Sequence, residues 1–268
     1  MGTILIPLAL NAAISVALFA VLWLINLRTR DPSFIDSAWA LGLVLLAVDS
    51  FLFSGGAAKP DPHRWLLVGL CAVWGLRLGI YLLWRWRKQG PDRRYATMMG
   101  LAQKDRGWGY AKASLLLVFA LQAPLQYVVS LPVQLGQFGD ARPLGHLAAA
   151  GLALALIGIV FESLGDWQLA RFKGDPANAG KVLDTGLWRY TRHPNYFGDA
   201  CVWWGLYLIA AETGLGAWAL PGPILLTFLL TRWSGVPTVE GRMRRKRPDY
   251  EAYVQRTSGF FPMLPKKG

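Results

Sequence analysis

Long apolar runs recur along the chain, and each is long enough to cross a bilayer as a helix. One helical crossing takes about 20 mostly apolar residues. Seven runs come close to this length or exceed it, at about 3–27, 33–53, 65–84, 113–133, 143–169, 195–211 and 213–231. They lack the apolar–polar alternation of barrel strands, and lipid cannot satisfy an open sheet edge. The pattern therefore predicts an all-α, polytopic integral membrane protein with seven transmembrane helices in a single domain over residues 1–268.

The positions of the basic residues predict how these helices are oriented. The chain has 28 Lys and Arg against 16 Asp and Glu. If the N-terminus lies outside, the segments 28–32, 85–112, 170–195 and 232–268 lie inside and hold 24 of these cations. The outside segments hold three, which are Lys59, Arg64 and Arg142. By the positive-inside rule the N-terminus is outside and the tail 232–268 is cytoplasmic.

The composition excludes several other classes of protein. Apolar residues make up 54% of the chain and charged residues 16%, which is the reverse of a disordered sequence. The net charge of +12 is explained by the cytoplasmic face, where part of it can bind anionic lipids, so no nucleic-acid partner is predicted. Cys71 and Cys201 lie in apolar runs and the three histidines are far apart, so neither a disulfide scaffold nor a metal site is predicted. The first run has no basic start and is too long for a signal peptide, so we interpret it as an anchor.

Ionisable side chains within the predicted spans are candidates for function, because a charge at membrane depth is costly. There are six of them: Asp36, Asp49, Arg77, Glu162, Asp166 and Asp199. Asp49 is near the outer end of its helix, where it reaches water. The other five lie towards the inner halves of their helices, which predicts a polar cavity that opens to the cytoplasm. The alternative is a set of structural ion pairs, such as Arg77 with Glu162.

Residues 186–199, GLWRYTRHPNYFGD, introduce the sixth predicted helix. A proline opens that helix, and the free N–H groups of a helix start favour an anion. Arg189 and Arg192 flank this point and can fork a phosphate. Asn195 and Asp199 are four residues apart, so they share one helical face. The segment predicts a pocket for a ligand with a phosphate-like end and a polar end buried among helices; the alternative is a basic anchor at the membrane surface.

Two further groupings support the same pocket more weakly. Asp166 can accept hydrogen bonds from a nucleobase or ribose, while Arg171 and Lys173 can meet phosphates, although the end of a helix favours cations in any case. Arg77 and Tyr81 share a face of the third helix.

Taken together, residues 186–199, residues 166–173 and the ending from Tyr250 to Pro262 resemble the membrane-embedded steroid 5α-reductase family in its short bacterial form. The resemblance is strongest over residues 160–265 and weaker over 30–100. It implies a seven-helix fold in the bacterial inner membrane that binds NADPH from the cytoplasm. The implied substrate is a 3-oxo-4-ene steroid or another lipophilic enone, whose carbon–carbon double bond is reduced. A glycine-rich dinucleotide fingerprint is not expected for this family.

The resemblance also implies roles for individual residues. Cofactor contacts would come from Arg77, Tyr81, Arg93, Arg94, Asp166, Lys173, Tyr190, Arg192, His193, Asn195 and Asp199. Asp36 would face the substrate ketone, with Trp39 and Trp74 lining the substrate site. To polarise the ketone Asp36 must be protonated, which burial favours. Trp74 falls where the family has a tyrosine, and an indole cannot act as an acid near neutral pH, so Tyr95 or water would supply the proton.

A methyltransferase is the alternative enzyme. The Arg-His-Pro-Asn-Tyr motif is also similar to that of the isoprenylcysteine carboxyl methyltransferases, which bind S-adenosylmethionine. Their C-terminal pattern is matched by Glu240, Tyr250 and Pro262. A sulfonium ligand would favour aromatic and acidic walls over arginines. The first half favours the reductase through Asp36, Trp39, Arg77 and Tyr81. A transporter, the third alternative, is disfavoured by the absence of sequence repeats. The oligomeric state is left open.

Overall fold

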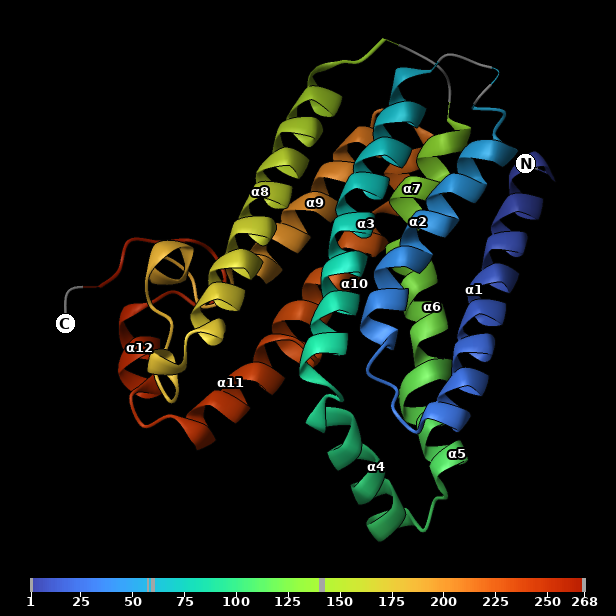
Figure 1. Cartoon of the computed structure of the whole chain (residues 1–268). Helices are drawn as coiled ribbons and strands as arrows, with labels where there is room; N and C mark the ends of the chain where they lie inside the picture. The colour runs from blue at the N-terminus through green and yellow to red at the C-terminus, as the bar shows by residue number, and fades with distance from the viewer. Residues whose placement is uncertain (1, 57, 59–60, 140–142, 267–268) are drawn as a thin grey trace.

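The computed structural model describes residues 2–56, 58, 61–139 and 143–266, and these residues form an all-helical protein (Figure 1). The first half contains α1 (Gly2–Thr29), α2 (Ile35–Phe53), α3 (Pro62–Gln89), α4 (Arg93–Arg106), α5 (Tyr110–Ser114), α6 (Ala120–Val129) and α7 (Leu131–Leu135). The second half contains α8 (His146–Gly174), α9 (Pro194–Ala211), α10 (Pro221–Phe228), α11 (Val236–Lys246) and α12 (Tyr250–Arg256). Short 3-10 turns lie at Gly136–Phe138, Pro176–Asn178, Gly186–Arg189 and Leu215–Ala219.

Within the described residues, six helical segments are long and apolar enough to cross a membrane, which is consistent with an integral membrane protein. They are Ile4–Thr29, Ile35–Phe53, Pro62–Gln89, Tyr110–Val129, His146–Gly174 and Leu215–Lys246. The sixth predicted span, 195–211, forms α9 but does not belong to this set. Its polar first turns contain Asn195 and Asp199, and α9 packs along α8 instead of facing outward over its whole length.

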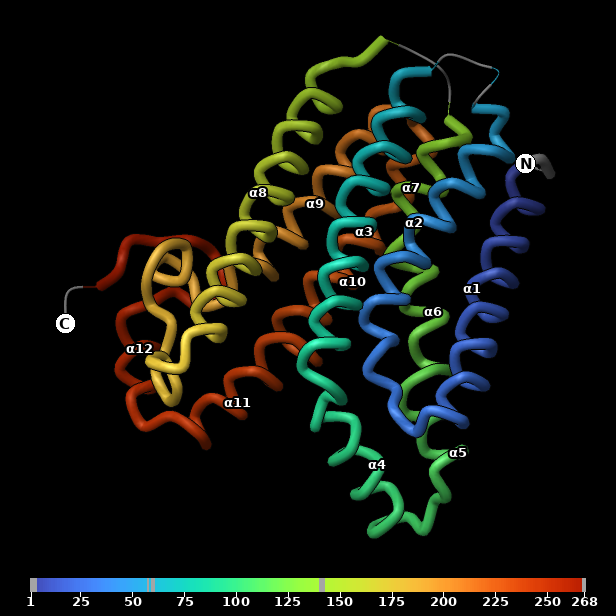
Figure 2. Tube along the Cα trace, in the orientation of Figure 1, coloured from blue at the N-terminus to red at the C-terminus, as the bar shows by residue number. Residues whose placement is uncertain are grey.

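Two of the predicted spans are interrupted helices. The span predicted at 113–133 contains α5, a π-helical turn at Leu115–Phe119, and α6 with Pro124 inside it. Proline and π turns are common causes of helix bends, because both break the regular hydrogen-bond ladder. The last span likewise runs through a π-helical turn at Leu229–Trp233 before α11 turns away, as the tube in Figure 2 shows. The charged helix α4 lies in a segment for which the sequence predicted only a loop.

Glycines bring α8 and α9 into close contact. A Cβ atom added at Gly158 would lie 2.5 Å from the backbone oxygen of Gly198, and one at Gly151 would lie 2.6 Å from that of Gly205. Gly165, one further step of seven residues along α8, faces the start of α9. Small residues of this kind let two membrane helices approach until their backbones touch. The contact therefore sets the side chains of α8 at positions 162 and 166 directly against the first turns of α9.

The polar ends of the helices gather at one end of the bundle. In Figure 1 this is the lower end, where α4, α11 and α12 lie, whereas the N-terminus is at the upper end. The cytoplasmic segments of the predicted topology lie at this lower end, so one end of the molecule carries most of the basic residues. Lys59 and Arg142, two of the three cations assigned to the outside, fall outside the described residues.

Candidate functional site

Arg77 is the centre of a buried group of charges between α3, α8 and α9, which we call the inner polar cluster (Arg77, Glu162, Asp166, Asn195 and Asp199). One terminal nitrogen of Arg77 lies 2.7 Å from Asp166, and the other lies 2.6 Å from Glu162. Glu162 and Asp166 are one helical turn apart on α8, so a single arginine reaches both. The ion pair of Arg77 with Glu162, which the sequence raised as an alternative to a ligand site, is therefore present in the structure.

The inner polar cluster still contains polar atoms without a partner among the described residues. The Asn195 amide donates to Asp166 at 3.4 Å, which leaves its own oxygen Oδ1 unpaired. Asp199 is only 9% exposed, and its Oδ1 has no hydrogen-bond partner. Nε of Arg77 is also unpaired. A buried polar atom that makes no hydrogen bond is costly, so the cluster offers one donor and two acceptors to a ligand.

Three basic side chains lie within electrostatic range of Lys173, and together with it we call them the cationic mouth (Arg85 on α3, Lys173 on α8, Arg242 on α11 and Arg247 just after α11). Lys173 ends α8 and lies within electrostatic range of the other three. Asp92 lies beside them: burial alone would raise its pKa, but the backbone N–H and guanidinium of Arg94, together with Arg242, hold the pKa below its usual value. Cations this close repel one another unless anions join them. The mouth therefore favours an anionic ligand.

A second polar group joins the start of α2 to α4, and we call it the α2–α4 cluster (Asp36, Arg94 and Tyr95). The Tyr95 hydroxyl donates to Asp36 at 2.7 Å, and the Arg94 guanidinium lies 3.0 Å from the other oxygen of the same carboxylate. Asp36 thus acts as an acceptor, whereas its predicted role of polarising the ketone requires it to carry a proton. Burial and the neighbouring Asp36 raise the pKa of Tyr95 well above its usual value, so the phenol stays protonated at neutral pH.

Tyr196 links the two clusters. It lies on the first turn of α9 and is within electrostatic range of Arg94, Asp36 and Asp199. Its hydroxyl therefore experiences the charges of both clusters.

Arg192 and His193, which were expected to contact the cofactor, instead hold the C-terminal tail. Arg192 lies 2.8 Å from Glu240 and donates to the backbone oxygens of Val254 and Thr257. His193 lies 3.1 Å from the same Glu240 oxygen. Burial lowers the pKa of His193, although the Glu240 carboxylate opposes this effect. Both side chains thus contact the tail in the structure, and their expected contacts with a cofactor stay a prediction.

The remaining predicted residues lie in varied settings. The Tyr81 hydroxyl faces the backbone oxygen of Asp166 at 3.5 Å, beside the inner polar cluster. Trp74 is fully buried, where its indole N–H donates to Glu162 at 2.8 Å. The backbone oxygen of Trp39 accepts from Gln126. Arg93 and Tyr190 are exposed, and neither enters either cluster.

Sequence reasoning left four contributors out of the cofactor-binding set: Glu162, Arg85, Arg242 and Arg247. Two of them, Arg85 and Glu162, could have been found from their four-residue spacing to other site residues. Arg85 continues the four-residue steps from Arg77 and Tyr81 on α3, and Glu162 precedes Asp166 by four residues on α8. The two tail arginines carry no such signal, because only the folded path of α11 brings them to Lys173.

Comparison with known proteins gives a family for this chain. Residues 22–257 match the model of a family described as a protein of unknown function (DUF1295). An uncharacterised protein of Schizosaccharomyces pombe, C594.04c, is 24% identical over 288 residues, which covers 96% of this chain and 80% of the yeast protein. No solved structure matches the chain significantly.

Proposed function

The chain belongs to the DUF1295 family, and we propose that within it this protein is an NADPH-dependent oxidoreductase that reduces the carbon–carbon double bond of a lipophilic enone, such as a 3-oxo-4-ene steroid. One observation carries the proposal. The cationic mouth and the inner polar cluster lie in sequence along the same helices, α3 and α8, with charge at the surface and unpaired hydrogen-bonding atoms inside. A ligand with phosphates at one end and an uncharged amide at the other fits this order.

NADPH has both ends, and the residues present fit each of them. Its phosphates match the cations of the mouth, with Lys173 and Arg85 nearest the buried side. Its carboxamide offers two donors and one acceptor, which complement the unpaired oxygens of Asn195 and Asp199 and Nε of Arg77. When bound, NADPH supplies the hydride that the reduction needs.

The protein's own task is to stabilise the negative charge that develops on the substrate oxygen as the β-carbon is reduced. The α2–α4 cluster provides two donors for this purpose: the Arg94 guanidinium, which has further N–H groups, and the Tyr95 phenol, whose single O–H turns from Asp36 to the substrate oxygen when substrate binds. Asp36 accepts hydrogen bonds from both and so holds them in place. Tyr95 then passes its proton to the reduced substrate and is reprotonated from the cytoplasm. The hydrogen bond that polarises the ketone, expected of Asp36 or its neighbour, is thereby assigned to Tyr95. Asp36 is the residue that positions Tyr95.

The proposed topology has seven crossings, with the N-terminus outside and the mouth open to the cytoplasm of a bacterial inner membrane. The seventh crossing is α9, whose polar turns are covered by α8. The concentration of 24 of the 28 basic residues in alternate segments supports this orientation. A lipophilic enone would enter from the membrane, and anionic lipids would contact the basic face.

One observation favours a methyltransferase as the second candidate. The inner polar cluster has three carboxyl groups and a single arginine, and this acidic excess suits the sulfonium of S-adenosylmethionine. S-adenosylmethionine carries no phosphate, however, so the cationic mouth would have no counterpart on that ligand. We therefore prefer the reductase.

Ligand-dependent stability separates the two candidates. The purified protein is titrated with NADPH, NADH and S-adenosylmethionine, and the unfolding midpoint is recorded, since a ligand of the native state raises it. We expect the largest rise with NADPH and a reduced rise in Lys173→Gln, whereas Lys181→Gln, an exposed lysine in the following loop, should respond as the wild type does. A rise with S-adenosylmethionine alone would exclude the reductase.

A further inference from the structure

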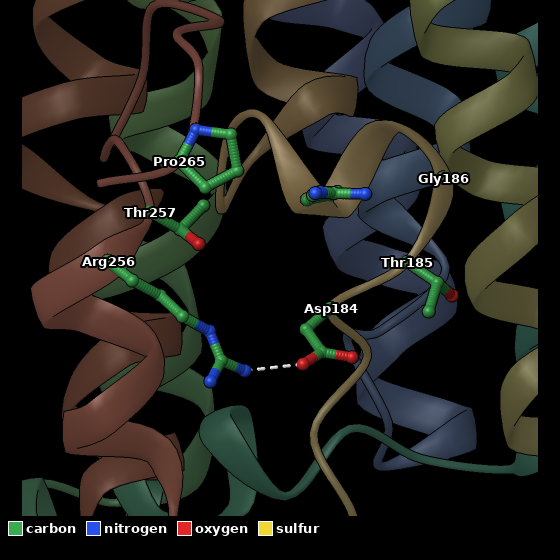
Figure 3. A pocket seen from close by; sticks show the side chains of 7 residues that line it. Asp184, Thr185, Gly186, Arg256, Thr257 and Pro265 are labelled. Atoms are coloured by element: carbon green, nitrogen blue, oxygen red, sulfur yellow. Dashed lines mark hydrogen bonds and ion pairs between the residues drawn. The ribbon is translucent and has the colours of Figure 1, made fainter. Parts of the chain in front are cut away.

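A cleft of about 400 Å³ lies between the loop that follows α8 and the C-terminal tail (Figure 3). Its lining includes two arginines and two threonines, one of each from either wall: Arg189 and Thr185 from the loop, and Arg256 and Thr257 from the tail. This volume is in the range of small-ligand sites. The cleft contains none of the residues of the inner polar cluster, the cationic mouth or the α2–α4 cluster.

The two walls of the cleft are tied together by backbone hydrogen bonds. The N–H of Arg192 donates to the oxygen of Ser258 at 2.9 Å, and that of Met263 donates to the oxygen of Tyr190 at 3.0 Å. The N–H of Lys266 closes the tail back onto Arg256 at 2.9 Å. In Figure 2 the gold loop and the red tail accordingly run beside each other. These bonds hold the two walls of the cleft in place, which lowers the entropic cost of binding a ligand between them.

The charge inside the cleft is positive. Asp184 pairs with Arg256, and Figure 3 shows the two side chains pointing toward each other across the opening. Arg189 has no ion-pair partner among the described residues, so its charge is uncompensated. The Thr257 hydroxyl points toward the same space in Figure 3 and is available as a donor.

The cleft lies on a different face of α8 from the inner polar cluster. The loop packs on α8 through Gln168, which accepts from the N–H of Leu187 at 3.0 Å, and through Trp188, whose indole donates to the oxygen of Gly165 at 3.1 Å. Asp166 points instead to Arg77 on α3. A neighbouring cavity of about 300 Å³ shares Thr185 and Gly186 with the cleft and continues along α8 past the exposed Trp167 and Arg171.

We propose that this cleft is a second ligand site, which binds a phosphoryl group between Arg189 and Arg256 with a hydroxyl contact from Thr257. Two guanidinium groups on opposite walls form the charge-assisted, forked contacts that phosphate oxygens favour. Asp184 holds Arg256 in its place. The phosphoryl group belongs either to a soluble phosphate compound or to an anionic phospholipid, whose glycerol and chains would follow the neighbouring cavity past Trp167. The site does not depend on the proposed reductase activity.

The first arm of the test uses inorganic phosphate. The full-length protein in phospholipid-free detergent is titrated with phosphate at constant ionic strength, and the apparent dissociation constant is taken from the unfolding midpoint. Arg189→Gln should weaken binding about tenfold or more, because it removes a charge-assisted hydrogen bond. Lys173→Gln weakens the cationic mouth, so the effect of Arg189→Gln is also measured in that background, where the same loss is expected if the cleft is a separate site. Arg244→Gln, which breaks another exposed arginine–carboxylate pair on the tail, is the matched control.

The second arm uses lipids. Protein from nanodiscs that contain phosphatidylcholine and phosphatidylglycerol is analysed by native mass spectrometry, and the phosphatidylglycerol retained by wild type is compared with that retained by Arg189→Gln. Loss of retention in the variant assigns the site to a headgroup, whereas a phosphate response without retention assigns it to a soluble compound. If wild type and Arg189→Gln give the same result in both arms, the proposal is wrong. Arg189 makes no ion pair, so its replacement leaves the fold intact.

Discussion

At the scale of single residues, most buried charged side chains of the site lie where an oppositely charged side chain pairs with them. Arg77 satisfies two carboxylates of α8, and Glu240 satisfies both Arg192 and His193. Asp199 has no such partner, although it is almost fully buried. A buried polar atom that makes no hydrogen bond costs about 1–3 kcal/mol. Several such atoms occur among the described residues, but those of Asp199, Asn195 and Arg77 lie together, and this grouping indicates where a ligand binds.

Asp199→Ala and Asn195→Ala should abolish turnover of a 4-ene-3-one while the yield of folded protein is kept. Asp199 Oδ1 has no hydrogen bond to lose among the described residues, so its removal leaves the packing partners as they are and removes a buried oxygen without a partner. A loss of about 10²-fold or more in kcat/KM is expected, in line with the removal of one preorganised polar contact. Product analysis and size-exclusion chromatography measure the two quantities, with Asp105→Asn on exposed α4 as control. Unchanged turnover in both variants would show that the pocket lies elsewhere.

Tyr95→Phe tests the proton donor. Loss of a general acid should lower kcat by about 10²- to 10⁴-fold and leave NADPH affinity near that of wild type. Tyr110→Phe is the matched control, because that phenol also donates at 2.7 Å, to Asn26, but lies outside both clusters. Since burial and Asp36 raise the pKa of Tyr95 above its usual value of about 10, the wild-type rate should not fall through ionisation of this phenol at or below that pH. A rate that falls with a midpoint near neutral pH would assign the proton to another group.

At the scale of elements, the contact of α8 with α9 decides the geometry of the site. It depends on glycines at positions 151, 158, 165, 198 and 205, where backbone meets backbone. A single added methyl group would separate the helices and with them Asp166 from Asn195. The opposite ends of the same two helices carry no site residue, so the close approach matters most in the halves that carry Asp166 and Asn195.

Gly158→Ala should destabilise the protein by about 1–3 kcal/mol, the usual cost of overpacking, and lower activity with it. Its Cβ would meet the Gly198 oxygen at 2.5 Å and the Val202 nitrogen at 2.7 Å. Gly69→Ala on α3 is the comparison: its Cβ meets nothing within 4 Å, so the change should be neutral or slightly stabilising. Thermal unfolding in detergent gives both values. Equal stability of the two variants would mean that the helices are not in backbone contact.

At the scale of the whole molecule, the apolar runs predicted the helices well. They were a poor guide to which side chains pair across the fold. Lipid requires every backbone group to be hydrogen-bonded within a helix, so an apolar run such as 35–53 is enough to predict a helix. Neither the breaks around residues 115–119 and 229–233 nor helix α4 follows from apolar content. The pairing of Arg192 with Glu240 links residues 48 apart, and no local pattern reveals it. Most members of the inner polar cluster could be predicted, because each is a charged or amide side chain at membrane depth. Arg242 and Arg247 could not, because they reach the cationic mouth only through the fold of the tail.

Cysteine labelling tests the topology. Lys104→Cys on α4 and Leu144→Cys ahead of α8 place single exposed thiols at opposite ends of the bundle. The native Cys71 and Cys201 are buried and stay unreactive. In intact cells a membrane-impermeant maleimide should label Leu144→Cys alone, and after lysis it should label both. Labelling of Lys104→Cys from outside would reverse the orientation and move the mouth out of reach of cytoplasmic NADPH.

The transfer of a hydride from NADPH to an enone is tested most directly with a labelled cofactor. Purified protein is incubated with a 4-ene-3-one steroid and NADPH carrying deuterium at the transferable position of the nicotinamide ring, and the product is analysed by mass spectrometry and NMR. We predict a saturated ketone with one deuterium at the former β-carbon and a solvent-derived proton at the α-carbon. An unreduced steroid, or a reduced one without deuterium, would contradict the account.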